Sequence, residues 1–227
     1  MLDQWVIEKH EEPWPYMVID NFYDEETWNY IQHNIVHNCK KYFTQWPERW
    51  GKCKVQKQLT YGPLDRVIVR PNRLSYEPHE DSIITNYFLK HTGEDFIKKY
   101  FKTYRSYTQL KPYISVKYAW EQGQILDIHD ETSDKVLSVI TYLSPQHNIG
   151  TMVYDKNKNL KHTTPWKQNR AFVMCGIDGV TWHNCISSKS SPSPTESVVG
   201  NASNRITIDY FATRPNSEIS LPMHISK

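Results

Sequence analysis

The sequence lacks the patterns that mark a secreted or disulfide-rich protein. Its four cysteines form no C-x-x-C pair and are too few for a dense disulfide framework. The opening residues, MLDQWVIEKHEE, contain no basic stretch followed by an apolar run, which a secretory signal needs. These absences predict a protein of the reducing cytoplasm.

Long hydrophobic runs and a strong charge imbalance are also missing. No segment approaches the roughly 18 consecutive apolar residues of a membrane-spanning helix, so we expect no membrane partner. The formal net charge of +2 requires neither nucleic acid nor an anionic membrane as a partner. The 227 residues show no internal repeat, and a hydrophobic content of 38% is enough to bury the core of one domain.

The first half of the chain is predicted to be rich in helices after one short strand. Residues 16–20 have strand character, and Asp24 can cap a following helix whose apolar residues recur at helical spacing. Two further helices are predicted over residues 81–89 and 93–101. Residues 40–80 contain four prolines among several aromatic residues, which predicts a long irregular stretch of the kind that covers a site.

The second half is predicted to consist of short strands separated by polar turns. This order favours a mainly β fold, a double-stranded β-helix (a cupin-like jelly roll) with N-terminal flanking helices. We expect a single domain, with helical support and a lid over residues 1–105, the jelly-roll core over 106–214 and a tail over 215–227. The Ser- and Pro-rich residues 189–204 are expected to form a loop. The predicted strands cover residues 114–120, 136–143, 151–154, 171–174 and 205–211.

Candidate metal ligands stand in the middle of this second half. His129 and Glu131 are two residues apart, so on an extended segment their side chains point the same way while Asp130 points away. With His183 they would supply two imidazoles and one carboxylate, the donor set of a non-haem Fe(II) site with open positions. Asp127 is equally well spaced from His129, and spacing alone leaves both carboxylates open. Ordinary, partly buried histidines are the other interpretation.

Several short segments occur in a specific order around these residues. The H-x-E triplet is followed by Lys135 and by an apolar strand that ends in Tyr142-Leu143. The other segments, in chain order, are PYMVIDNF at 15–22, GTMVY at 150–154, NRAFVM at 169–174, WHN at 182–184 and RITIDYF at 205–211. Together they resemble the iron- and 2-oxoglutarate-dependent dioxygenases, particularly the prolyl-hydroxylase-like branch.

The resemblance covers most of the chain except residues 40–105, and it has one departure. Glu131 stands where the family usually has aspartate, although glutamate occurs in some members, notably Jumonji-type enzymes. The resemblance favours Glu131 over Asp127 as the carboxylate ligand. It therefore implies an Fe(II) site formed by His129, Glu131 and His183.

The resemblance also implies a binding site for the cosubstrate. Arg205 would pair through its planar guanidinium with the far carboxylate of 2-oxoglutarate, and Thr207 would donate its hydroxyl to the same group. Tyr118 and Tyr142 stand where family members place phenols that reach the cosubstrate, with core aromatic residues as the equally weighted alternative.

The activity that follows from the resemblance is hydroxylation coupled to the conversion of 2-oxoglutarate and dioxygen into succinate and carbon dioxide, and ascorbate is a candidate reductant. A peptidyl, prolyl-type substrate is favoured, and a small metabolite or a nucleobase stays open because fold and cofactor do not determine the substrate. Basic and aromatic residues in 40–70 are compatible with a nucleic-acid surface, but a solvated loop explains them better. A metal-free jelly-roll binding or structural module is the alternative from a different class.

Overall fold

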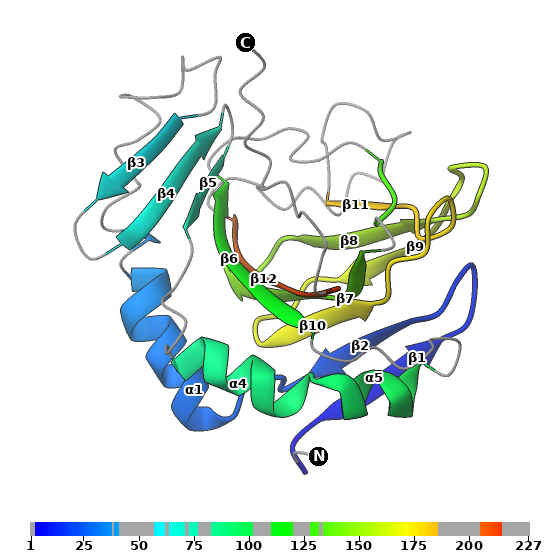
Figure 1. Ribbon diagram of the computed structural model, residues 1–227, viewed down its shortest axis with the longest axis horizontal. Helices are drawn as coiled ribbons and strands as arrows, with labels where there is room; N and C mark the ends of the chain where they lie inside the picture. The colour runs from blue at the N-terminus through cyan, green and yellow to red at the C-terminus, as the bar shows by residue number, and fades with distance from the viewer. Residues whose placement is uncertain are drawn as a thin grey trace.

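The fold consists of two antiparallel β-sheets that face each other, with helices on the outer side of the larger sheet (Figure 1). The computed structural model describes residues 3–37, 39–40, 57–61, 64–70, 73–76, 83–101, 110–119, 128–131, 134–185 and 205–214. Within these residues, the mainly β architecture with N-terminal helices that the sequence predicts is confirmed.

The larger sheet carries most of the strands. Its order is β1 (Val6–His10), β2 (Tyr16–Asp20), β10 (Arg170–Met174), β7 (Lys135–Ser144), β12 (Arg205–Thr213), β6 (Lys111–Ala119), β5 (Arg73–Tyr76), β4 (Leu64–Arg70) and β3 (Lys57–Tyr61). The smaller sheet has the order β11 (His183–Cys185), β8 (Ile149–Tyr154) and β9 (Leu160–Pro165). The central neighbours β2, β10, β7, β12 and β6 are far apart in the sequence, as expected where strands alternate between the two sheets of a jelly roll.

The helices are α1 (Glu25–Tyr30), the π-helical segment η1 (Ile31–Val36), α4 (Ile83–His91) and α5 (Glu94–Tyr100). As predicted, Asp24 caps α1, because its side chain accepts a hydrogen bond of 2.8 Å from the backbone N–H of Thr27. The helices lie along the outer face of the larger sheet (Figure 1). Phe88 of α4 stacks on Tyr210 of β12 with ring centroids 4.5 Å apart, which anchors the helical layer to the centre of the sheet.

The side chains of β12 enter two buried layers, one on each side of the larger sheet, because they alternate between its faces. Ile206, Ile208 and Tyr210 belong to the hydrophobic core under the helices. Arg205 and Thr207 alternate with these residues and are buried as well. The larger sheet is therefore covered on both faces, and the polar face of β12 lies inside the jelly roll.

A second hydrophobic core fills the space between the sheets. Tyr142 of β7 and Phe172 of β10 belong to this core together with Val153 of the smaller sheet. Trp14 joins the same cluster, and its indole N–H donates to the carbonyl of Tyr154 at 3.0 Å. These contacts hold the smaller sheet over the larger one and enclose the volume in which the candidate site lies.

The prediction of an irregular stretch over residues 40–80 is wrong for the part that the structure describes, because that part contributes β3, β4 and β5 to the larger sheet. The run Val67-Ile68-Val69 has the β-branched character of a strand. Pro63 and Pro71 flank β4 in the sequence, and proline is tolerated at the ends of strands, where a missing N–H costs least. The prolines therefore delimit this strand.

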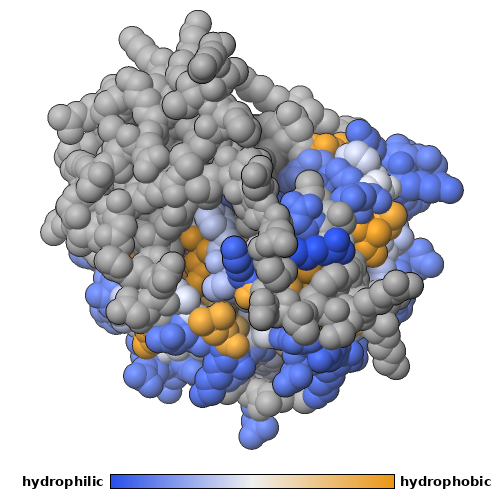
Figure 2. Space-filling model, viewed as in Figure 1, coloured by the Kyte–Doolittle hydropathy of each residue, from blue (hydrophilic) through white to orange (hydrophobic). Residues whose placement is uncertain are grey.

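The described surface is mixed in character. On the face shown in Figure 2 it is mostly hydrophilic, with separate hydrophobic patches. The exposed large hydrophobic side chains lie on different elements, among them Val6 of β1 and Leu89 of α4. In the part of the chain that the structure describes, no helix is both long enough and apolar enough to span a membrane.

Candidate functional site

Three residues of the sequence prediction converge at one point between the sheets. His129, Glu131 and His183 each offer a ligand atom, and these atoms all lie within 4.8 Å of one another. Glu131 and His183 are each 3% exposed, whereas His129 is partly exposed. Two imidazoles and a carboxylate at this separation form a donor set that suits Fe(II) and leaves open coordination positions.

The backbone explains how residues so distant in the sequence meet. The N–H of His129 donates to the carbonyl of His183 at 3.0 Å, and the N–H of His183 returns a bond of 2.8 Å to the carbonyl of His129. This pair forms an antiparallel bridge, and β11 then continues beside β8. The imidazole rings consequently lie side by side, with centroids 4.3 Å apart.

The protonation state of His183 suits a metal ligand. Its Nδ1 lies 2.8 Å from the carbonyl oxygen of Thr181, to which a protonated Nδ1 donates. This tautomer leaves the lone pair of Nε2 directed at the site. Burial, together with the neighbouring His129, lowers the pKa of His183 to about 4, so the imidazole is neutral at physiological pH.

Glu131 is held as a buried carboxylate between cationic or basic groups. Its Oε1 lies 3.7 Å from His183 Nε2, which is longer than a hydrogen bond and leaves both atoms available to a common ion. Its Oε2 lies 2.6 Å from Lys135 Nζ as an ion pair without a well-directed hydrogen bond. Burial acts to raise the pKa of Glu131, but Lys135 and the two histidines outweigh it and lower the pKa.

Arg205 is a buried cation at the start of β12. It is 4% exposed, and one of its Nη atoms donates to the carbonyl of Ile149 at 3.3 Å. Its guanidinium carbon lies 5.0 Å from the ring centre of Trp166 and 5.8 Å from that of Tyr142. Among the described residues it has no acidic partner, and a buried cation without one is costly. This environment favours an anionic ligand.

Thr207 follows Arg205 on the same face of β12, and its hydroxyl donates to Asp209 Oδ1 at 3.1 Å. Asp209 is itself paired with Lys117 of β6. The hydroxyl predicted to reach the cosubstrate is thus engaged with a carboxylate in this structure. Asp209 is an additional buried polar residue of the sheet, and Lys117 is partly buried.

The structure brings Tyr142 to Arg205 but places Tyr118 elsewhere. On β6 the partner of Thr207 is Lys117, whereas Tyr118 is paired with Ile206. Tyr118 therefore lies in the core under the helices, on the opposite face of the sheet from Arg205. Tyr142 contacts Thr151 through its hydroxyl, which lies 2.8 Å from Thr151 Oγ1 and accepts the backbone N–H of Thr151 at 2.9 Å.

Other parts of the prediction lie outside the described residues. These are Asp127, the alternative carboxylate, most of the lid region between 40 and 56, the loop at 189–204 and the tail. Trp166 was missed by the sequence reasoning, although it lies against both Tyr142 and Arg205. Its only signal in the sequence is a tryptophan after a proline at a strand end, which many loops share.

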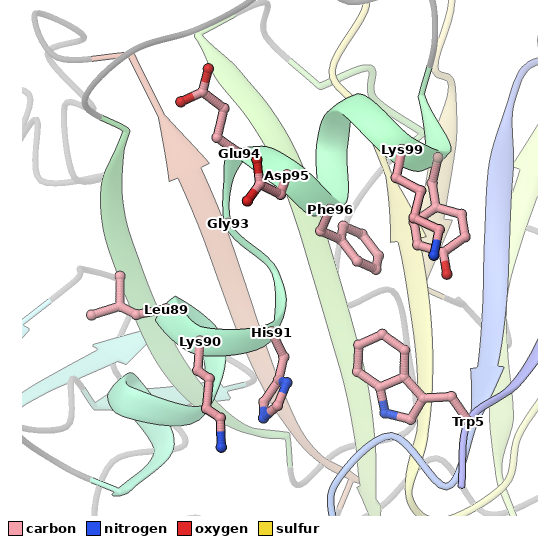
Figure 3. Close-up of a pocket in the computed structure, with 10 residues that line it drawn as sticks. Trp5, Leu89, Lys90, His91, Gly93, Glu94, Asp95, Phe96 and Lys99 are labelled. Atoms are coloured by element: carbon pink, nitrogen blue, oxygen red, sulfur yellow. The ribbon is translucent and has the colours of Figure 1, made fainter. Parts of the chain in front are cut away.

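A separate hollow of about 460 Å³ lies between α4, α5 and the N-terminal segment (Figure 3). Lys90, Lys99, Glu94 and Asp95 contribute charges of both signs to its lining, and Trp5 packs edge to face with the ring of Phe96 inside it. The hollow contains none of the candidate metal ligands. We therefore assign the chemistry to the space between the sheets.

No protein-family model matches the chain, and no curated protein matches it. Solved structures do match. A prolyl-4-hydroxylase from Pseudomonas putida aligns over 88% of this chain and 92% of its own, with a TM-score of 0.50 and 8% identity. This chain has the fold of that oxygenase. The jelly roll expected from the resemblance to iron- and 2-oxoglutarate-dependent dioxygenases is thereby confirmed at the level of fold.

Two further structures are similar at lower scores. An oxidoreductase of the 2OG-Fe(II) oxygenase family from Burkholderia pseudomallei matches over 64% of this chain and 70% of its own, with a TM-score of 0.44 and 12% identity. A Shewanella oneidensis protein described as an oxygenase matches over 63% of each chain, with a TM-score of 0.42 and 14% identity. Because this last alignment spans less than two thirds of the relative, activity and substrate are matters for proposal.

Proposed function

We propose that this chain is an Fe(II)- and 2-oxoglutarate-dependent oxygenase that hydroxylates its substrate. The observation that carries the proposal is the convergence of the ligand atoms of His129, Glu131 and His183 within 4.8 Å on an oxygenase fold. The buried Arg205, with no acidic partner in the described part of the chain, supports it by supplying a site for the cosubstrate's far carboxylate.

The residues have distinct roles in this proposal. When bound, Fe(II) with 2-oxoglutarate and dioxygen would supply the oxidising chemistry, yielding succinate, carbon dioxide and a hydroxylated product. His183 presents Nε2 to the metal because its Nδ1 is bonded to the Thr181 carbonyl. Glu131 contributes one oxygen while Lys135 balances the charge of the other. Arg205 orients the cosubstrate by its distal carboxylate.

The residues of the proposed site are shielded from bulk water. Glu131, His183 and Arg205 are nearly inaccessible to solvent, so their electrostatic interactions with a ligand are stronger than they would be in water. The apolar core between the sheets limits access of bulk water to the same space. For the substrate, we favour a peptidyl prolyl-type group on the basis of the sequence resemblance, with a nucleobase or a small metabolite as alternatives.

The proposal is tested first on the cosubstrate. Purified protein with Fe(II) and 2-oxoglutarate under nitrogen should develop the weak visible absorption band of the metal chelate, and on exposure to air it should form succinate. His183→Ala should abolish both signals, whereas His33→Ala, which changes an exposed histidine of η1, should retain them. A wild-type protein that shows neither signal would support a metal-free binding or structural module instead.

The substrate class requires a second experiment. Pools of proline-containing peptides, nucleosides and small metabolites are incubated separately with the loaded enzyme, and products are sought by a mass gain of one oxygen. We expect oxidised product in the peptide pool and none with His183→Ala. Oxidation confined to the nucleoside or the metabolite pool would retain the oxygenase and replace the prolyl-type substrate.

A further inference from the structure

Trp166 occupies a fixed position beside Arg205, although it belongs to the connection after β9. Its ring lies nearly parallel to that of Tyr142, with centroids 4.6 Å apart and an interplanar angle of 12°. Its indole N–H donates to the carbonyl of Pro145 at 2.8 Å. One contact reaches β7 of the larger sheet and the other the turn that follows it, so Trp166 is held from two directions.

The second ring of this stack is fixed as well. The hydroxyl of Tyr142 contacts both the side chain and the backbone N–H of Thr151. Gly150 lets the strands approach, because a Cβ atom built there would lie 2.0 Å from the carbonyl oxygen of Thr164 and 3.1 Å from the Tyr142 hydroxyl. The tyrosine therefore contributes its ring to the neighbourhood of Arg205, while its phenol is used to join β7 to β8.

The position of Arg205 against these rings determines which of its atoms can bind a ligand. A cation over an aromatic face gains an electrostatic attraction that is strongest for tryptophan, and Arg205 lies 5.0 Å from the centre of Trp166. All N–H donors of a guanidinium lie in its plane, so a ring stacked against that plane leaves them free. One donor is used by the carbonyl of Ile149. The remaining donors can form the bidentate pair with a carboxylate.

We propose that Trp166 is a positioning residue that orients the guanidinium of Arg205 for the distal carboxylate of a 2-oxo dicarboxylic acid. The proposal rests on the proposed function, since it assigns 2-oxoglutarate as the ligand. It extends that function because it makes Trp166, in the segment that follows β9 of the smaller sheet, a determinant of which 2-oxo acid binds. A 2-oxo acid without the distal carboxylate gains nothing from Arg205 and should be indifferent to Trp166.

The test compares two ligands that share the metal-chelating end. Mn(II)-loaded protein, which does not turn over, is titrated by calorimetry with 2-oxoglutarate and with 2-oxopentanoate, which lacks the distal carboxylate. In Trp166→Met, 2-oxoglutarate should bind about tenfold more weakly, the scale of one desolvated cation–π contact, while 2-oxopentanoate is unchanged. The dissociation constant of 2-oxopentanoate divided by that of 2-oxoglutarate therefore falls about tenfold, which a general loss of structure would not produce.

Two further variants make the result decisive. Trp166→Phe keeps an aromatic face but loses the bond to Pro145, so its ratio should lie between those of the wild type and Trp166→Met. If Trp166→Met does not fold, this phenylalanine variant decides alone. Trp5→Met, in the hollow between α4, α5 and the N-terminal segment, should leave the ratio unchanged. An unchanged ratio in the Trp166 variants overturns the inference, whereas a wild type that fails to bind 2-oxoglutarate overturns the proposed function.

Discussion

Lys135 Nζ lies 2.6 Å from Glu131 Oε2, and in this ion pair the glutamate side chain is 3% exposed to solvent and the lysine side chain 24%. The lysine also lies over the ring of Phe211, 4.3 Å from its centroid. Glutamate has one more rotatable bond than aspartate, so as the proposed metal ligand Glu131 needs a partner to restrict it. Lys135 supplies that restriction by holding one oxygen while the other faces His183.

Replacing Lys135 by methionine should therefore weaken metal binding. Residues that orient metal ligands typically contribute about 10-fold to 100-fold in affinity, and we expect about tenfold here. The measurement is a titration of the protein with Co(II), followed by its visible absorption. Lys161→Met is the matched control, because Lys161 forms an exposed ion pair with Asp155 away from the triad. Equal affinities in the two variants would show that Lys135 does not position Glu131.

Lys117 and Asp209 form a second ion pair on the inner face of the larger sheet. Asp209 is buried and Lys117 is partly exposed, so removing Lys117 leaves a buried charge uncompensated and costs about 3 kcal/mol, whereas removing both charges is much cheaper. Lys117→Met should lower the free energy of unfolding by about that amount, Asp209→Asn by less because the lysine left behind reaches solvent, and the double variant by clearly less than their sum. Urea denaturation measures all four proteins. Strict additivity would contradict the coupling.

The same strands show what the sequence can and cannot predict. The strand predicted over residues 205–211 is confirmed, and the order of short segments indicates the triad. The face that each residue of β6 presents was harder to predict, because both faces of this sheet are covered. Pairing with β12 places Lys117 inside and Tyr118 under the helices. Only strand register, a long-range property, decides between these arrangements.

Trp166 was unpredictable for a related reason. Its neighbours Tyr142, Pro145 and Arg205 come from three other segments, and no local pattern links them. The three strands β3 to β5 escaped detection because prolines and aromatic residues suggested a loop, although the prolines mark strand ends. Motif order thus predicts the chemistry of this site better than it predicts the residues that hold it in place.

Asp20 makes stability depend on pH in the acidic range. Its carboxylate accepts hydrogen bonds from Arg170 Nε at 2.6 Å and Lys167 Nζ at 2.9 Å. Partial burial acts to raise the pKa of Asp20, but these two cations outweigh it and lower the pKa below the ordinary value of 3.8. A lowered native pKa means that the unfolded chain takes up the proton first, so the stabilisation is present above 3.8 and is lost as the pH falls through the native pKa.

Asp20→Asn should accordingly lower the free energy of unfolding at neutral pH by about 2 kcal/mol, the scale of hydrogen bonds to a charged group. The difference from the wild type should shrink as the pH falls from about 5 to below the native pKa. Urea denaturation at a series of pH values measures it. Lys167→Met should have a smaller effect, because Lys167 is half exposed. A difference that stays constant down to pH 3 would disprove the assignment.

Gly150 and Gly179 provide a matched pair of glycine substitutions with different physical causes. At Gly150 an added methyl group would collide with the backbone of Thr164 and approach the Tyr142 hydroxyl, so β8 and β9 would have to separate. At Gly179 the space is open, and the cost comes only from its φ of +70°. We expect Gly150→Ala to cost about 3 kcal/mol and Gly179→Ala about 1 kcal/mol in unfolding free energy.

Because the change at Gly150 also disturbs Tyr142, it should weaken 2-oxoglutarate binding by Mn(II)-loaded protein, whereas the change at Gly179 should not. Similar losses of affinity in both variants would show that the approach of β8 to β9 does not support the Arg205 site.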